Sequence, residues 1–219
     1  MPSAHDLSAV IAGMRGRAFG TMAAAAIALF AVTGCGSSKP ASLNGVVVTP
    51  RPNVAGVMLP DVANNGRPFP MRAEPRELLV VYFGYTSCPD LCPTTLSDIS
   101  VALRKIGGDR ARRVEVAMAT VDPDRDTPRV LTGYLDHFFA TSHALRTTDQ
   151  KALADAAAAF GVRYEVASHR PGDTNYDVGH TAFSYVVDYR GLVLVEWPFG
   201  IKPPEMASDL KLLLKEEAP

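Results

Sequence analysis

The sequence predicts an α/β fold in which helices flank both faces of a mixed β-sheet. From residue 78 onwards, short apolar runs alternate with segments that have the periodicity of amphipathic helices. Two β-prone runs, 181–188 and 192–197, then follow each other across Tyr189-Arg190-Gly191, which indicates a hairpin. A last amphipathic segment begins at Pro203-Pro204. Strand–helix units that end in a hairpin and a helix are typical of a mixed sheet covered on both sides.

The individual elements follow in chain order. Residues 45–75 combine two β-prone pieces, 46–49 and 54–59, with several prolines, and predict a short N-terminal hairpin and an irregular loop. Polar residues predict a loop at 168–179. Strands are predicted at 78–83, 114–121, near 144–147 and at 162–166, and helices at about 93–106, 127–138, 149–160 and 203–214.

Cys88 and Cys92 occupy the turn between the first buried strand and its helix. At a helix N-terminus, the backbone N–H groups without partners and the helix dipole favour a thiolate over a thiol. A thiolate is both a nucleophile and a soft metal ligand, so this position supports dithiol redox chemistry and metal binding alike. A dithiol after the first core strand, at the start of its helix, makes the predicted layout thioredoxin-like.

Composition restricts the class of protein. With 219 residues, of which 47% are hydrophobic, the chain is long enough for one domain with a sizeable core. The 22 basic and 23 acidic residues nearly balance. No basic run with interleaved aromatic residues occurs, so nucleic-acid binding has no support.

The N-terminal residues have the pattern of an export signal. Arg15 and Arg17 precede an apolar stretch, 18–32, that is short for a membrane-spanning helix and has the length of a signal-peptide core. Residues 32–35, Val-Thr-Gly-Cys, resemble a bacterial lipobox, which implies cleavage before Cys35 and lipidation of its thiol. The alternatives are a plain signal peptide and an N-terminal anchor with an incidental cysteine.

The lipobox leads to a division of the chain. We expect a lipoprotein signal peptide at 1–34, a flexible tether at 35–44 and a single domain at 45–219. The lipid on Cys35 would hold this domain on the outer face of the cell membrane without spanning it.

If Cys35 carries lipid, Cys88 and Cys92 are the only thiols of the mature domain. Their C-x-x-x-C spacing is one residue longer than the C-x-x-C of thioredoxin-type enzymes, yet both sulfur atoms can still meet in a disulfide or on one ion. Two thiolates are too few for a closed metal site. An added imidazole would give two sulfurs and one nitrogen, a set that suits Cu(I) and also tolerates Cu(II).

His180 differs in position from the other four histidines. It ends the long polar loop and enters the hairpin strand at 181–188. In a thioredoxin-like fold, the loop that enters this strand lies beside the dithiol turn, so His180 is a candidate ligand. The alternative is a strand-end histidine that bonds to the backbone.

Three stretches carry a resemblance: 82–93 (YFGYTSCPDLCP), 121–128 (VDPDRDTP) and 179–181 (GHT). Together, from about residue 55 to 200, the chain resembles the Sco/SenC family of copper-binding cytochrome oxidase assembly factors. The resemblance implies that Cys88, Cys92 and His180 bind one copper ion, Cu(I) or Cu(II). It also implies two partners, a copper donor and the cytochrome c oxidase subunit that carries the dinuclear CuA centre. The family delivers copper to that centre or keeps its thiols reduced.

Two carboxylates follow the second predicted strand. Asp122 ends this strand at the edge where the dithiol turn is expected, and is a candidate outer partner of the site. Asp126 is expected to contribute to the cap of the next helix. Around His180 the family more often has an acid and a serine. This chain has Gly179 and Thr181 on the two sides of His180 instead. The glycine is expected to loosen the loop, which bears on copper affinity more than on the identity of the ligand.

These residues favour a copper-binding protein over an enzyme. The alternative is a thiol-disulfide oxidoreductase or a peroxiredoxin-like peroxidase that uses Cys88 and Cys92. Thioredoxin enzymes usually have a cis-proline just before the strand that His180 enters, and this chain has no proline at 179 or 180. A peroxidase needs a cation, often arginine, beside its reactive thiol, and the sequence places no arginine near the turn.

Overall fold

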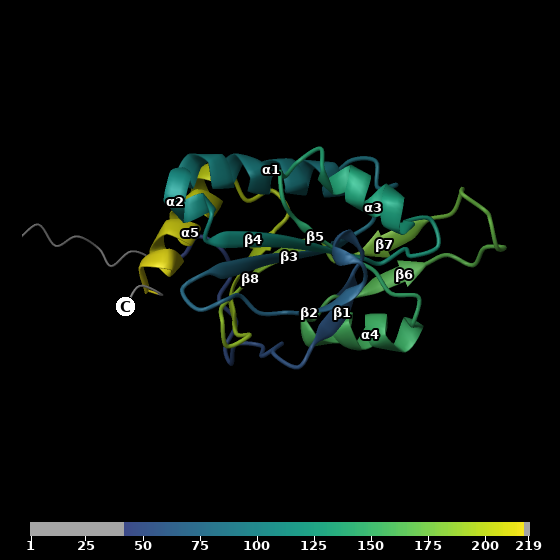
Figure 1. Cartoon of the computed structure of the whole chain (residues 1–219), viewed down its shortest axis with the longest axis horizontal. Helices are drawn as coiled ribbons and strands as arrows, with labels where there is room; N and C mark the ends of the chain where they lie inside the picture. Colours follow the sequence, from purple (N-terminus) through teal and green to yellow (C-terminus); the bar gives the residue numbers. More distant parts are fainter. Residues whose placement is uncertain (1–41, 217–219) are drawn as a thin grey trace, which may run out of the picture. The chain divides into compact units, whose positions relative to one another are not determined.

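The computed structural model describes residues 42–216 (Figure 1). Within this part of the chain, a seven-stranded sheet has the order β2-β1-β5-β4-β3-β8-β9, and β6 and β7 form a separate two-stranded sheet. The strands are β1 (Met58–Asp61), β2 (Arg67–Pro70), β3 (Leu78–Gly84), β4 (Val114–Thr120), β5 (His143–Leu145), β6 (Tyr164–Val166), β7 (Val178–His180), β8 (Phe183–Val187) and β9 (Val193–Pro198). The helices are η1 (Val62–Asn64), α1 (Leu91–Ile106), α2 (Gly108–Ala111), α3 (Pro128–Leu135), α4 (Gln150–Ala159) and α5 (Pro203–Glu216).

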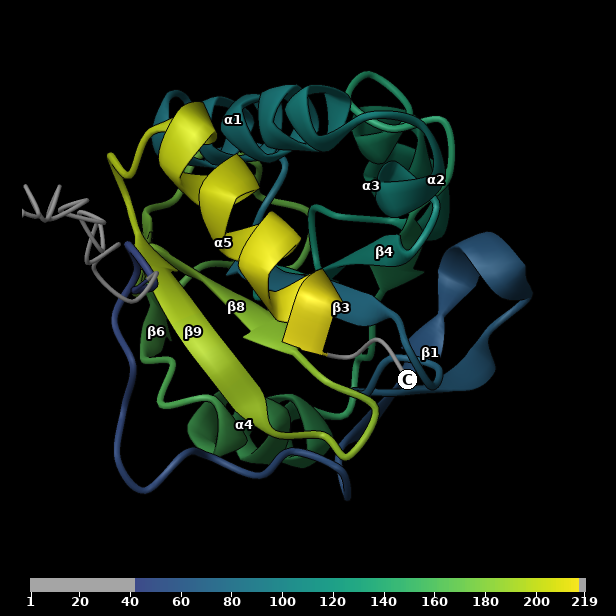
Figure 2. The same ribbon diagram turned by 90° about the vertical axis from the view of Figure 1, so that its left-hand side faces the viewer.

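The large sheet is built around β3, in which every residue is buried. β3 pairs in parallel with β4 and antiparallel with β8, so the sheet is mixed. Helices α1 and α5 pack against each other on one side of this sheet and α4 lies on the other (Figure 1; Figure 2). The continuous apolar sequence of β3 follows from this arrangement, because a strand covered on both faces has no solvent side. The predicted α/β fold is confirmed.

The N-terminal hairpin exists but is shifted along the chain from its predicted position. It is formed by β1, which includes the last two residues of the predicted piece 54–59, and by β2, with Asp61 opposite Arg67, and the piece at 46–49 is not part of it. Prolines disfavour β-structure in this segment, yet Pro68 and Pro70 lie in β2. They are tolerated because β2 is at the edge of the sheet, where a missing N–H deprives no neighbouring strand of a hydrogen bond.

Two helix boundaries bear on the site. α3 begins where predicted, because Oγ1 of Thr127 accepts a hydrogen bond from the N–H of Val130. α1 begins at Leu91, slightly before the predicted start. As a result Cys88 lies in the turn after β3, whereas Cys92 lies in the first turn of the helix.

The first described residues are fastened to α5. The carboxylate of Asp209 accepts hydrogen bonds from the N–H of Asn44 at 2.7 Å, the N–H of Gly45 at 3.1 Å and Nε1 of Trp197 at 2.9 Å. Asn44, the last residue of the expected tether, is therefore held in place. The apolar core of the described part draws its residues from Leu43 to Leu214.

The signal peptide expected at 1–34 and the lipidation site Cys35 lie outside the described residues, so both stay predictions. In the part of the chain that the structure covers, no helix has the length and apolar character needed to cross a membrane.

Candidate metal centre

Three potential ligand atoms converge near the carboxyl end of β3. The sulfur atoms of Cys88 and Cys92 and a ring nitrogen of His180 lie within 4.8 Å of one another, and both thiols are free. Nε2 of His180 is 3.4 Å from Sγ of Cys92, and the N–H of Cys92 donates to Sγ of Cys88 at 3.4 Å. Among residues 42–216, these three form the one such group of three or more histidine, cysteine or acidic side chains able to hold a metal ion.

The topology of the sheet explains the convergence. The turn after β3 carries Cys88 and leads into α1. β8 pairs antiparallel with β3, with Ser184 opposite Tyr82, so the chain that enters β8 arrives at the carboxyl end of β3. β7 shortly precedes β8. His180, at the end of β7, therefore comes to lie beside the dithiol.

Gly84 provides space for the second thiol. A Cβ atom at this position would lie 3.1 Å from Sγ of Cys92 and 2.6 Å from a ring carbon of Tyr82. The side chains of Cys92 and Tyr82 are fully buried, so neither has free space into which it could move. The last residue of β3 is therefore glycine because the sulfur and the ring approach its backbone closely.

The two thiols have different environments. Cys88 is 8% exposed and Cys92 is 0% exposed. Burial acts to raise the pKa of Cys88, but hydrogen bonds from Cys92, from the N–H of Asp90 and from the hydroxyl of Tyr85 bring the pKa below its ordinary value. For Cys92 burial dominates and raises the pKa to about 12. In the metal-free protein, Cys88 is thus the thiol that ionises first.

His180 presents a neutral nitrogen to the thiols. Its Nδ1 is 3.0 Å from the carbonyl oxygen of Thr181, and a bond to a carbonyl requires Nδ1 to carry the hydrogen. The lone pair is then on Nε2, the nitrogen nearest Cys92. Burial lowers the pKa of His180, which favours the neutral, metal-binding form. The rings of Tyr82 and Tyr85 pack edge-on against the imidazole, with centroid distances of 6.0 and 5.8 Å.

These donors fit a soft metal ion. Two thiolates select Cu(I), and an imidazole nitrogen as third donor makes the set acceptable to Cu(II). A closed structural zinc site would take four protein ligands. The chemistry of the three side chains therefore fits copper better than zinc.

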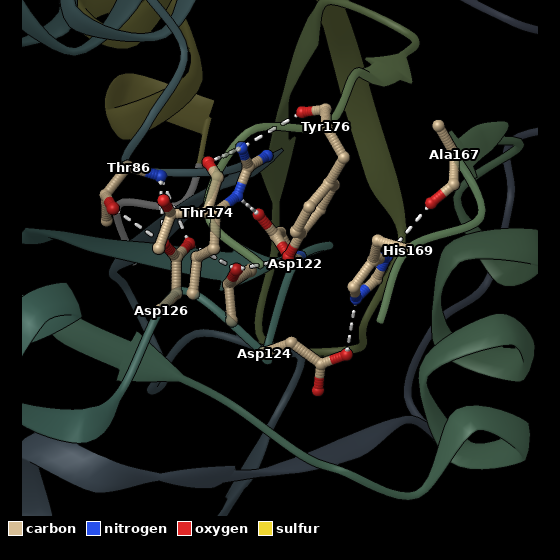
Figure 3. Close-up of polar contacts among 10 residues, drawn as sticks. Thr86, Asp122, Asp124, Asp126, Ala167, His169, Thr174 and Tyr176 are labelled. Carbon is tan, nitrogen blue, oxygen red and sulfur yellow. Dashed lines mark hydrogen bonds and ion pairs between the residues drawn. The ribbon is translucent and has the colours of Figure 1, made fainter. Parts of the chain in front are cut away.

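Asp122 lies one layer further out than Cys88, Cys92 and His180. Its carboxylate forms an ion pair with Arg125 and accepts a hydrogen bond from the hydroxyl of Tyr176 at 2.6 Å (Figure 3). Arg125 in turn lies over the ring of Tyr85, 5.6 Å from its centroid. Asp122 thus reaches the ligands through its neighbours, and its role as an outer partner stays a prediction.

The expectation that no arginine lies near the dithiol turn is wrong. Arg125 and Ser87 of the turn line the same cleft, which has a volume of about 740 Å³. The chain reverses after β4 and brings Arg125 back toward the turn, which residue spacing alone does not reveal. The positive charge of Arg125 is nevertheless paired with Asp122.

Asp126 is a structural residue of the dithiol turn and does not cap α3. It is fully buried and accepts hydrogen bonds from the N–H of Thr86 at 3.1 Å, the hydroxyl of Thr86 at 2.5 Å and the hydroxyl of Thr120 at 2.5 Å. These bonds connect the turn after β3 to the end of β4. Its place directly before the cap residue Thr127 suggested a capping role, and the sequence carries no separate signal for its contacts with Thr86 and Thr120.

Known proteins resemble this chain in sequence and in fold. The chain is 32% identical over 150 residues to an SCO2-like protein of Rickettsia conorii, a match that covers 68% of this chain and 72% of that protein. The apo Sco1 structure from Thermus thermophilus matches with a TM-score of 0.68 and 29% identity, covering 78% of this chain and 97% of that one. The Bradyrhizobium japonicum ScoI structure with copper bound matches with a TM-score of 0.59 and 31% identity, covering 71% and 96%.

The SCO1/SenC family model matches residues 62–215, a range that includes both cysteines of the turn and His180. This range is well over half of the 219 residues. The chain therefore belongs to the SCO1/SenC family.

Proposed function

We propose that this protein takes one copper ion, Cu(I) or Cu(II), between Cys88, Cys92 and His180 and passes it on during the assembly of cytochrome c oxidase. The observation that carries the proposal is the approach of the two sulfurs and one imidazole nitrogen to within 4.8 Å of one another. Further support comes from the related Bradyrhizobium japonicum ScoI structure, which has copper bound. The recipient in this proposal is the oxidase subunit that carries the CuA centre.

Copper is the ion that is delivered in this proposal, and each of the three side chains has its own role in holding it. The thiolates of Cys88 and Cys92 are the strong soft ligands, and Nε2 of His180 is the third donor, oriented by the hydrogen bond from Nδ1 to Thr181. Transfer proceeds by ligand exchange, in which a thiolate of the recipient replaces one donor at a time. Cys88, the less buried sulfur, is the one that a recipient reaches first.

We further propose that the protein acts outside the cytoplasm. In this proposal, residues 1–34 direct export and are removed, a lipid on Cys35 anchors the chain to the outer face of the membrane, and the domain at 45–219 carries the copper site. Mass spectrometry of the membrane fraction tests this. The N-terminal peptide should begin at Cys35 and carry a lipid mass, and a soluble chain that begins elsewhere contradicts the proposal.

The copper content of residues 36–219 tests the proposed site. This fragment contains all of the apolar core of the described part. We expect one copper per chain with and without reductant, and a Cu(II)–thiolate absorption band under oxidising conditions. His180→Ala should lose or shift this band. His137→Ala is the matched control, because His137 is exposed and its Nδ1 bonds to the carbonyl of Gly133. A fragment that takes up no copper, or an unchanged band in His180→Ala, contradicts the proposal.

A dithiol oxidoreductase is the second candidate, and the unlike environments of Cys88 and Cys92 favour it. The Cys88 thiolate would attack a substrate disulfide to form a mixed disulfide and release one substrate thiol. Cys92 would then attack Cys88, which releases the second substrate thiol and leaves a Cys88–Cys92 disulfide. An added small-molecule dithiol would reduce this disulfide and restore the two thiols for the next cycle. Fast turnover of the metal-free protein with this reductant, retained in His180→Ala, would favour the enzyme over the copper carrier.

A further inference from the structure

We propose that Asp122, Arg125 and Tyr176 form a clasp whose task is to hold His180 opposite the two thiols. The three are positioning residues, since they act on the site through the loop 167–177 and through Tyr85. The inference rests on the proposed function, because it takes His180 as a copper ligand.

His180 needs such support because its own strand is short. Within residues 42–216, β7 pairs only with β6, over three residue pairs from Tyr164–His180 to Val166–Val178. A two-stranded sheet of this size is marginally stable on its own. The loop 167–177 leads directly into β7, so contacts that hold the end of this loop also hold the chain just before His180.

The clasp binds this loop at its C-terminal end. Nη1 of Arg125 donates to the carbonyl oxygens of Thr174 at 3.2 Å and Tyr176 at 3.0 Å. The hydroxyl of Tyr176 donates to Asp122 at 2.6 Å, and Asp122 pairs with Arg125 (Figure 3). The guanidinium carbon of Arg125 also lies over the ring of Tyr176, 3.9 Å from its centroid.

The ion pair at the centre of the clasp is shielded from water. The side chain of Asp122 is 1% exposed and that of Arg125 is 11% exposed. Hydrogen bonds to ionised groups that are shielded from water contribute more than neutral ones at the surface. Asp122 lies two residues after the end of β4, an interior strand of the large sheet, so the clasp connects the loop to the end of this strand.

Arg125 is also connected to the imidazole of His180 through the ring of Tyr85. Arg125 lies over Tyr85, 5.6 Å from the ring centroid, and the Tyr85 ring packs edge-on against His180 at 5.8 Å. On the outer side, His169 stacks on Tyr176 with a centroid distance of 3.7 Å and contacts Asp124 at 3.2 Å. Arg125 therefore connects the loop that precedes His180 with the ring that packs against it.

Positioning of His180 has a distinctive chemical consequence. Two thiolates suffice for Cu(I), whereas the nitrogen donor is what makes the site acceptable to Cu(II). Opening the clasp should therefore weaken Cu(II) binding far more than Cu(I) binding. A general loss of structure would weaken both together.

The test compares Cu(I) and Cu(II) affinities of residues 36–219 by competition with chelators. Tyr176→Phe keeps the ring over Arg125 and removes only the hydroxyl that binds Asp122. We expect Cu(II) binding about tenfold weaker, an altered Cu(II) electron paramagnetic resonance spectrum, and Cu(I) binding within about twofold of the wild type. Arg125→Lys keeps the positive charge beside Asp122 but removes the planar guanidinium that donates to the carbonyl oxygens of Thr174 and Tyr176. It should weaken Cu(II) binding in the same way as Tyr176→Phe. Tyr189→Phe, in the turn between β8 and β9, is the matched control and should behave like the wild type.

The outcomes separate the clasp from the copper site itself. A wild type without copper uptake refutes the proposed function and the clasp with it. If His180→Ala loses Cu(II) affinity while Tyr176→Phe and Arg125→Lys match the wild type, the site stands and the clasp is refuted. Equal losses for Cu(I) and Cu(II), together with a lower unfolding temperature, also refute it. If Tyr176→Phe does not fold, Arg125→Lys carries the same test.

Discussion

Nε2 of His180 lies 3.4 Å from Sγ of Cys92, although 88 residues separate them in the chain. The contact joins β7 to the first turn of α1 at the end of the central strand β3. It also connects the two candidate functions, because a neutral imidazole beside a buried sulfur can bind a metal or accept the thiol proton. Predictions about this pair therefore need a readout that separates metal binding from thiol reactivity.

Cys88 should be alkylated before Cys92 in the reduced, metal-free protein. Hydrogen bonds lower the pKa of Cys88, while burial raises that of Cys92 to about 12 and leaves it without solvent contact. At neutral pH we expect at least about a tenfold difference in rate with iodoacetamide, since the thiolate is the reactive form. Timed alkylation and fragmentation of the peptide that contains both cysteines measures it. Equal rates would show that the two environments do not differ as described.

Gly84→Ala should destabilise the fold and the copper site together. The added Cβ would come within 2.6 Å of the buried Tyr82 ring and 3.1 Å of Sγ of Cys92, and such overpacking costs about 1–3 kcal/mol of unfolding free energy. Urea denaturation and copper affinity measure the two effects. Gly179→Ala is the matched control for stability, because a Cβ there would meet nothing within 4 Å, and we expect a change within about 0.5 kcal/mol. Similar stabilities for both variants would contradict the tight packing at Gly84.

Asp126→Ala should loosen the dithiol turn. The change leaves the N–H and hydroxyl of Thr86 and the hydroxyl of Thr120 without their acceptor in a buried place. We expect a loss of about 2–4 kcal/mol of unfolding free energy, because unpaired buried polar groups carry their full desolvation cost. Asp136→Ala, an exposed acid at the end of α3, should change stability by no more than about 0.5 kcal/mol. A loss of similar size in both variants would mean that Asp126 has no special role.

The regular elements were predictable because each has a strong local signal. β3 is a continuous apolar run, α1 and α5 have apolar residues at helical spacing, and the β8–β9 turn contains Gly191 with a positive φ of 75°. The placement of His180 near the dithiol was expected from the thioredoxin-like layout and from the family resemblance, and the structure brings the two together.

The errors arose where tertiary contacts override local signals. The polar run at 168–179 hides the start of β7, which pairs with β6 across the loop 167–177 and has no apolar run of its own. Arg125 has no local feature that distinguishes it from a surface arginine, because its partners Thr174 and Tyr176 are about 50 residues away. Asp126 stands next to a true helix cap, and only its burial beside Thr86 shows that it does something else.

His143 should make the stability of the protein depend on pH. Its Nδ1 is 2.8 Å from Asp61 of β1 and its Nε2 is 3.7 Å from Glu115 of β4, while the ring packs against Phe69 of β2. Burial acts to lower the pKa of His143, but Glu115 and Asp61 outweigh it and raise the pKa above its ordinary value. The protonated ring is therefore favoured in the folded state and holds the β1–β2 hairpin to the rest of the sheet.

The sign of the effect follows from this shift. Because the pKa is higher in the folded than in the unfolded state, the stabilisation is fully present below the unfolded value of about 6.5 and is lost as pH rises through the folded value. Urea denaturation of the wild type and of His143→Gln from about pH 5 to pH 9 measures it. The difference in unfolding free energy should be largest at the acidic end and should shrink as pH rises. Glu115→Gln removes one of the two carboxylates that raise the pKa of His143. The difference in unfolding free energy between Glu115→Gln and the double variant Glu115→Gln/His143→Gln should therefore disappear at a lower pH than the difference between the wild type and His143→Gln. A difference that is independent of pH would show that His143 stays neutral in the folded protein.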